Sequence, residues 1–344
     1  MSTIHSRGRA GQSGAARYVT LSSVQSALFC DTVVQSAHDH RRRTHVSLRQ
    51  RVRDIWRKNA PEVIGWWDGS LPEFVTARRP LEPLDGVPVF GYHLVEHDKF
   101  EADLAFLRTN GYTTLDTTEL VDFLSGRAVI SPRSVMLTFD DGPRNFHDVA
   151  FPLLQKYGAK AVAFIAPGLH AEAEIPDVAA RPMTWGEIRT IAASGLVEFQ
   201  SHTFESRYVP NWPMPAALAG CDPAIENARR REPRPLDADL VDSRKAIVAH
   251  VPSASVEHLC FPMYIGNDDA IRTASSVGFK GCYWGLLKGR PLNRAGQSPL
   301  TISRVSDEFL RRLPGEGRVG FGHLIRERLH RIRLARQWRR QYGD

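Results

Sequence analysis

The sequence predicts an α/β fold with a parallel sheet that is closed, or nearly closed, into a barrel. From Val87 onward, apolar runs of strand length alternate with amphipathic helical segments, and this alternation is typical of parallel strands joined by helices. At least six such repeats follow one another, which favours a barrel. An open, doubly wound sheet is the alternative. In both architectures the functional groups lie just past the carboxyl ends of the strands.

Each predicted strand is a short, nearly continuous apolar run. Helix signals lie between these runs: Asp116 with Glu119, and Thr184 with Glu187, form capping-box patterns. Asn267 can cap a later helix. The predicted strands are 87–94, 134–139, 161–166, 197–202, 256–261 and 279–284, and helices are expected to stop at Gly111, Gly158, Gly195 and Gly278.

Composition changes along the chain predict four regions. Residues 1–46, rich in Ser, Ala, Arg and His, are predicted to be a disordered N-terminal tail, followed by an extension over 47–86. The barrel is expected over 87–314, with a proline-rich surface insertion at 208–236. Residues 315–344 are predicted to be a basic C-terminal helix.

The charge balance restricts the classes of partner. The 344 residues carry a formal net charge of +7, which suits an acidic polymer, a membrane surface or nucleic acid. We expect no nucleic-acid partner, because no recognised binding module accompanies the charge. The basic segment 324–341 has an apolar side that either docks on the barrel or contacts an anionic membrane peripherally. With no signal peptide and no transmembrane run recognised, a cytoplasmic protein is predicted.

The strongest chemical signal is TFDDGP at 138–143, directly after the apolar run 134–137. Two neighbouring carboxylates at a strand end raise the pKa of one of them or recruit a cation. A divalent metal that binds one carboxylate and leaves the other as a base resolves this repulsion. The alternative is an ordinary Asp-Gly turn with an incidental second aspartate.

The TFDDGP segment, followed by an amphipathic helix and an apolar strand, resembles the first motif of the polysaccharide deacetylase family, the NodB-homology domain of carbohydrate esterase family 4. Three further segments resemble family motifs in the same order. The resemblance spans 87–314, is strongest to members whose barrel begins with Tyr-His, and implies a distorted (β/α) barrel of about seven parallel strands. The further segments are Gly91-Tyr92-His93, Gln200-Ser201-His202-Thr203 and Phe261-Pro262-Met263-Tyr264.

This resemblance implies a metal-dependent hydrolase that removes N-acetyl (acyl) groups from an amino-sugar polysaccharide or oligosaccharide. Its nucleophile is a metal-bound water, and the cleaved bond is a carbohydrate amide, not a peptide. Asp140 matches the general base, and His93 matches the general acid. Asp141 and His202 match ligands of a divalent metal, for which zinc is expected.

The third motif region implies contacts with the substrate. The backbone N–H of Tyr264, beside Pro262, matches the donor that stabilises the oxyanion. The arginine that the family carries in this region is absent here, and Phe261 stands near its place.

The second metal histidine of the family is replaced by Ser206. Glu205 can supply an oxygen instead, giving an Asp-His-Glu set suited to zinc or a harder metal. Otherwise waters complete a weaker site with Asp141 and His202, or no metal binds and Arg207 neutralises the aspartates. The alternative function is therefore a catalytically degenerate deacetylase-like protein that binds glycan or a partner.

Overall fold

The computed structural model describes residues 70–80, 82–172, 182–204, 206, 235–264, 266–324 and 326. Its centre is a sheet whose strands follow the order β7-β6-β5-β4-β3-β1-β8, with β2 added beside β3, and every strand pair is parallel. The strands are β1 (Val89–Tyr92), β2 (Thr113–Thr114), β3 (Ser134–Asp140), β4 (Ala161–Ile165), β5 (Val197–Ser201), β6 (His258–Cys260), β7 (Gly281–Tyr283) and β8 (Val305–Ser306).

The sheet curls until its two edges approach each other. Just before β8, Ile302 forms a parallel bridge with Tyr283 of β7, while β8 itself pairs with β1. The short segment 302–306 therefore links β7 to β1. This is the distorted (β/α) barrel that the sequence predicts, with seven strands along its main path.

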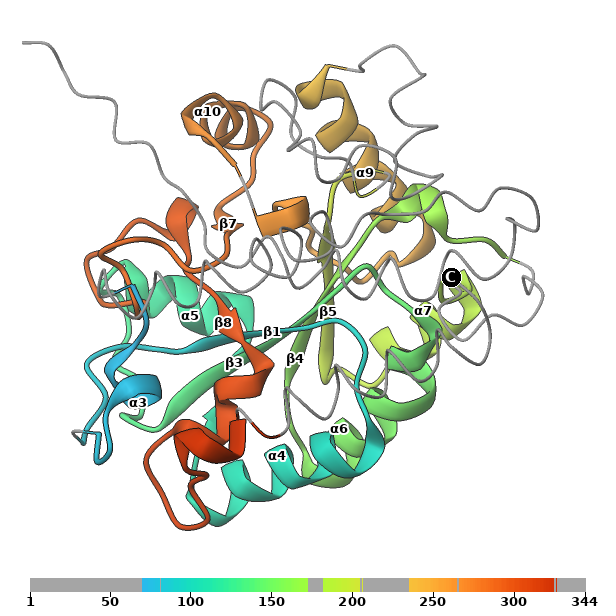
Figure 1. Ribbon diagram of the computed structural model, residues 1–344. Helices are drawn as coiled ribbons and strands as arrows, with labels where there is room; N and C mark the ends of the chain where they lie inside the picture. Colours follow the sequence, from blue (N-terminus) through green and yellow to red (C-terminus); the bar gives the residue numbers. More distant parts are fainter. Residues whose placement is uncertain are drawn as a thin grey trace, which may run out of the picture.

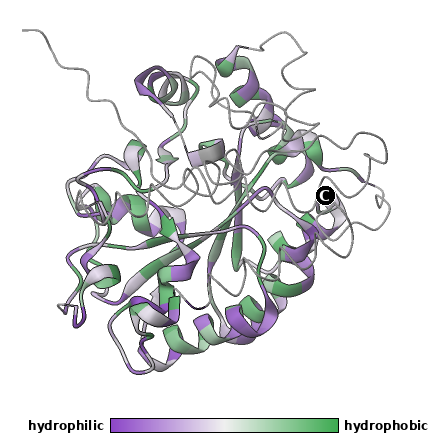
Figure 2. Cartoon of the chain, viewed as in Figure 1, coloured by the Kyte–Doolittle hydropathy of each residue, from purple (hydrophilic) through white to green (hydrophobic). Residues whose placement is uncertain are grey.

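Helices cover the outside of the sheet (Figure 1), with α4 and α6 packed side by side. In Figure 2 the strands are largely hydrophobic, and the hydrophilic residues gather on the helices and loops. The helices are α3 (Glu73–Thr76), α4 (His97–Thr109), α5 (Thr117–Leu124), α6 (Phe151–Tyr157), α7 (Trp185–Ala192), α9 (Leu236–His250) and α10 (Asp268–Ser276). Short helical turns are η2 (Phe146–Ala150), η3 (Pro167–Leu169), η4 (Pro262–Tyr264), η5 (Pro299–Thr301) and η6 (Asp307–Arg312).

The helix starts follow the local sequence signals. Both predicted capping boxes form, at the starts of α5 and α7, and Asn267 accepts the Ala270 N–H at the start of α10. Gly158 ends α6 at a φ of 63°, a left-handed conformation that suits glycine. The six predicted strands are confirmed, five of them with slightly shorter bounds and β3 with one more residue, whereas β2 and β8 were not predicted.

Strand β3 explains how Asp140 enters the barrel. All seven of its residues are buried, and successive side chains of a strand point to opposite faces. Val135, Leu137 and Phe139 belong to the larger core, which also contains helix residues. Met136 belongs to the smaller cluster, with Phe164, Cys260 and Tyr283 of other strands. Thr138 and Asp140 therefore share the inner face with Met136.

Three predicted segments fall largely outside the described residues. They are the N-terminal tail over 1–46, most of the insertion over 208–236, and most of the C-terminal helix predicted over 315–344, of which residues 315–320 are described and are not helical. Among the helices that are described, none is both long enough and apolar enough to cross a membrane.

His258, the first residue of β6, makes stability depend on pH. It is 4% exposed, and it packs against Gly281, where an added Cβ would collide with the imidazole. Burial lowers the pKa of His258 to about 4, so between this value and the ordinary 6.5 only the unfolded chain takes up the proton. We expect the free energy of unfolding to fall by about 2 kcal/mol between about pH 7 and pH 5 because of His258.

Urea unfolding of the wild type and of His258→Gln at both pH values tests this expectation. The variant should lose the share of the pH dependence that His258 supplies. An unchanged pH dependence in the variant would contradict the assignment.

Candidate active site

The two aspartates of the TFDDGP segment point in different directions. Asp140 ends β3 and is 1% exposed, whereas the Asp141 side chain is 29% exposed. The chain turns sharply here, because Asp141 and Gly142 have φ angles of 66° and 64°. A side chain at Gly142 would also collide with His170 and Ile165, so the turn requires glycine.

Asp140 is held by a buried arginine, Arg304. The guanidinium donates to both carboxylate oxygens, at 2.7 and 2.8 Å, and the Arg304 side chain is fully buried. It also donates to Thr138 Oγ1 and to the carbonyl of Trp284. Burial by itself would raise the pKa of Asp140, but the charge of Arg304 outweighs it and lowers this pKa to about 2. Asp140 is therefore ionised.

His202 lies one residue past β5, with its imidazole fixed by the end of β6. Its Nδ1 lies 3.0 Å from the carbonyl oxygen of Cys260. Because a carbonyl only accepts hydrogen bonds, Nδ1 carries the proton in the neutral ring, and the Nε2 lone pair is left free. This Nε2 lies 3.4 Å from Oδ1 of Asp141. These two atoms lie close enough to share a cation.

The site therefore fits a divalent metal at Asp141 and His202. A carboxylate oxygen and an imidazole nitrogen are both ordinary zinc ligands, and an outer hydrogen bond such as that from Nδ1 orients a ligating histidine. Asp140, His202 and Cys260 also form a group whose ligand atoms all lie within 4.8 Å of one another.

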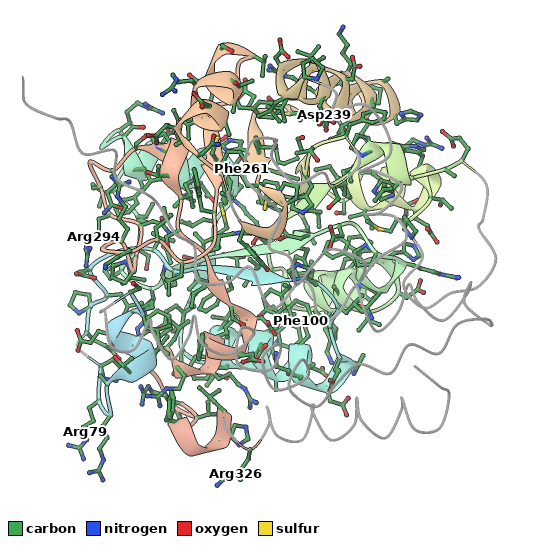
Figure 3. The ribbon with its side chains drawn as sticks, turned by 45° about the horizontal axis from the view of Figure 1, so that its top comes forward. Arg79, Phe100, Asp239, Phe261, Arg294 and Arg326 are labelled. Atoms are coloured by element: carbon green, nitrogen blue, oxygen red, sulfur yellow. The ribbon has the colours of Figure 1, made fainter. Side chains whose placement is uncertain are left out.

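Ser206 occupies the position of the missing histidine. Its hydroxyl donates to Asp141 Oδ1 at 3.1 Å, so it contacts the candidate ligand without being a good metal ligand itself. The loop is anchored by Asp239 of α9, labelled in Figure 3, whose carboxylate accepts the Phe204 N–H at 2.9 Å. Glu205 and Arg207, the two other predicted participants, lie outside the described residues.

His93 lies beside Asp140, one residue past β1. Its Nε2 lies 3.8 Å from Asp140 Oδ2, and its side chain is 15% exposed. The hydroxyl of Tyr264 lies 3.3 Å from Nδ1 of His93 and 3.4 Å from Nε2. The Tyr264 ring also lies against the Arg304 guanidinium, 4.6 Å from its central carbon.

The predicted oxyanion donor has a partner already. The Tyr264 N–H donates to the Phe261 carbonyl at 2.9 Å within η4, the turn that contains Pro262. Tyr264 has a φ of 62°, so the left-handed backbone aims its ring toward His93. In this conformation Tyr264 contributes its hydroxyl to the site, and its N–H reaches a substrate oxygen only if the turn changes.

The structure thus brings Asp140, His93 and Tyr264 together, and places Asp141, His202 and Ser206 beside them. Sequence reasoning missed Arg304, which supplies the positive charge that the third motif lacks, and it missed the contact of Cys260 with Asp140. Arg304 lies in the mixed stretch Thr301-Ile302-Ser303-Arg304-Val305-Ser306, which gave no clear signal.

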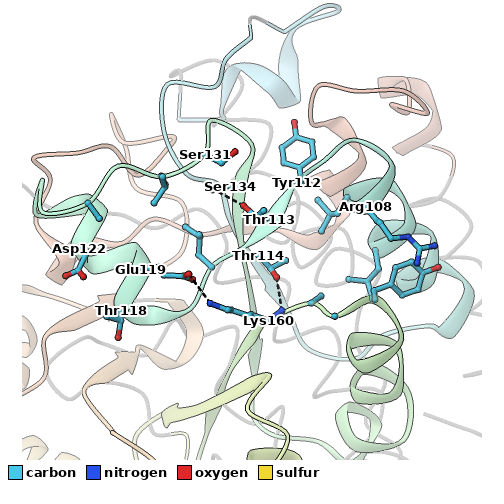
Figure 4. Close-up of a pocket in the computed structure, with 18 of the residues that line it drawn as sticks. Arg108, Tyr112, Thr113, Thr114, Thr118, Glu119, Asp122, Ser131, Ser134 and Lys160 are labelled. Carbon is cyan, nitrogen blue, oxygen red and sulfur yellow. Dashed lines mark hydrogen bonds and ion pairs between the residues drawn. The ribbon is translucent and has the colours of Figure 1, made fainter.

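A separate cavity of about 640 Å³ lies at the other end of the strands (Figure 4). It is bordered by α4, α5 and the segment before β4. Lys160, which projects there, is paired with Asp116 and Glu119 at 2.8 and 2.9 Å. None of the predicted site residues lines this cavity.

Comparison with known proteins agrees with this geometry. The poly-beta-1,6-N-acetyl-D-glucosamine N-deacetylase of Escherichia coli (strain K12) is 28% identical over 156 residues, which are 40% of this chain and 23% of that protein. The protein of the same name from Staphylococcus aureus (strain MRSA252) is 22% identical over 186 residues, 54% of this chain and 59% of that one. The chain therefore spans less than two thirds of either relative.

A solved structure shares the fold. The structure of IcaB from Ammonifex degensii superposes with a TM-score of 0.52 at 21% identity, covering 66% of this chain and 95% of that one. Residues 129–282, which contain the acid pair, His202 and Tyr264, match the profile of the polysaccharide deacetylase family. Over this segment, which is less than half of its length, the chain is similar to the polysaccharide deacetylase family.

Proposed function

We propose that this protein is a metal-dependent hydrolase that removes N-acetyl groups from an amino-sugar polysaccharide or oligosaccharide. The observation that carries the proposal is one cluster of side chains in which an ionised Asp140 lies close to His93 and to His202, with Asp141 beside His202. The names of the relatives suggest a β-1,6-linked N-acetylglucosamine polymer as the first substrate to test.

In this proposal Asp141 and His202 hold a divalent ion, for which zinc is the first candidate. When bound, such an ion lowers the pKa of water and polarises a carbonyl oxygen. Help of this kind is needed, because Asp140 with a pKa of about 2 is a weak base toward ordinary water.

The side chains then divide the proton transfers. Asp140 accepts a proton from the attacking water, and its orientation is fixed by Arg304. His93 delivers a proton to the departing amine, and the Tyr264 hydroxyl limits where the imidazole can lie. An acid and a base that flank one position are what amide hydrolysis requires.

The direct test is acetate release from N-acetylated oligosaccharides, including β-1,6-linked N-acetylglucosamine oligomers. We expect activity that a chelator abolishes and added zinc restores, with Asp141→Asn as the inactive control. If the wild type releases no more acetate than Asp141→Asn from any of these glycans, the proposal fails.

The second candidate function is a degenerate deacetylase that binds glycan without turnover, and Ser206 is the observation that favours it. Replacing Ser206 with histidine would add an imidazole beside Asp141. We expect the affinity for zinc to rise at least about tenfold, measured by calorimetry in competition with a chelator. Ser206→Ala removes the hydrogen bond without adding a ligand, so it serves as the matched control.

Tight, stoichiometric zinc binding by the wild type would count against a degenerate deacetylase.

Peripheral contact with an anionic membrane through 324–341 remains a separate prediction, because nearly all of that segment lies outside the described residues.

A further inference from the structure

Cys260 places a thiol in the same cluster of side chains. It is the last residue of β6 and is fully buried. Its Sγ lies 3.7 and 3.8 Å from the two carboxylate oxygens of Asp140. Its neighbouring strand partner in the inner cluster is Tyr283, so the thiol faces the barrel interior and not the helix layer.

The ligand atoms of Cys260, His202 and Asp140 lie within 4.8 Å of one another. Asp140 is the least suitable of these as a metal ligand, because Arg304 donates to both of its oxygens. Asp141 has one oxygen 3.4 Å from His202 Nε2. The His202 imidazole therefore has two better ligand groups close to it, the Asp141 carboxylate and the Cys260 thiol.

We propose that Cys260 is the third protein ligand of the divalent metal, in the place left by the histidine that Ser206 replaces. This inference rests on the proposed metal-dependent function. An Asp-His-Cys set provides the three protein ligands typical of a catalytic zinc site and leaves a position open. Zinc ligands lie roughly 3–4 Å apart, and the Cys260 thiol lies within 4.8 Å of a ring nitrogen of His202.

Charge supports this ligand set. A thiol that coordinates a metal loses its proton, here to solvent, so Asp141 and Cys260 together balance the two charges of the ion. Asp140 and Arg304 already balance each other. The buried site is then neutral, whereas an Asp-His-His set would leave one positive charge in the barrel. A thiolate ligand also favours zinc or cobalt over magnesium or manganese.

The test is a titration of the metal-free full-length protein with Co²⁺, followed by absorption spectroscopy. A cobalt–thiolate bond gives an intense charge-transfer band in the near ultraviolet, which oxygen and nitrogen ligands do not give. We expect the band in the wild type and its loss in Cys260→Ser, together with a fall in Co²⁺ affinity of more than about 100-fold.

Cys282→Ser is the matched control, because Cys282 is equally buried on the adjacent strand but belongs to the outer core. This variant should keep both the band and the affinity. Stoichiometric Co²⁺ binding without the band in the wild type, or a band that persists in Cys260→Ser, overturns the ligand assignment and leaves the proposed function intact. Failure of the wild type to bind Co²⁺ overturns both, and the wild-type spectrum decides even if Cys260→Ser does not fold.

Discussion

Replacing Asp140 with asparagine should lower the rate of acetate release by roughly 100- to 10,000-fold, the range attributed to a positioned general base. An amide of the same shape cannot take the proton from water. The effect should appear in kcat, because Asp140 is buried and its oxygens are engaged by Arg304. Substrate binding should change much less.

The measurement is steady-state kinetics on the best glycan, with zinc affinity determined for the same preparation. Asp122→Asn is a suitable control, because Asp122 is a partly exposed residue of α5 that pairs with Arg127 and should leave activity unchanged. A preserved kcat in Asp140→Asn would remove Asp140 from the chemistry. A large loss of zinc affinity in this variant would instead indicate that Asp140 is a metal ligand.

The parts of the fold that were predictable depend on local signals. Short apolar runs marked six of the strands, and Asp116, Thr184 and Asn267 cap helices where their patterns indicated. These signals act within one turn or one strand, so a single sequence is enough to read them. Strands β2 and β8 have two residues each, too few to show any periodicity.

The environment of Asp140 was not predictable for a different reason. Arg304 is 164 positions away in the sequence, and only closure of the barrel brings β8 beside β1. Likewise Cys260 contacts Asp140 because β6 ends with that side chain on the inner face, and a shift of one residue would have turned it outward. The motif residues could be recognised individually. Arg304 and Cys260, which surround the Asp140 carboxylate, reach it only through closure of the barrel and the register of its strands.

Replacing Arg304 with methionine should lower the free energy of unfolding by about 3–5 kcal/mol, because it leaves a buried carboxylate without its partner. The guanidinium makes its paired bonds to Asp140 inside the barrel, where water cannot replace it. Replacing both residues, as in Asp140→Leu with Arg304→Met, should recover much of this loss, since removing a whole buried ion pair is often nearly neutral.

Urea unfolding of the wild type, the two single variants and the double variant gives the coupling energy between these residues. Activity should be absent from the double variant even where stability returns, because the base is gone. If Arg304→Met were as stable as the wild type, the buried pair would not be intact in solution, and the ionised Asp140 on which the proposed hydrolysis depends would lose its support. A stable but inactive double variant would separate the two roles of the pair. Arg304 stabilises the buried carboxylate of Asp140, and Asp140 accepts the proton during hydrolysis.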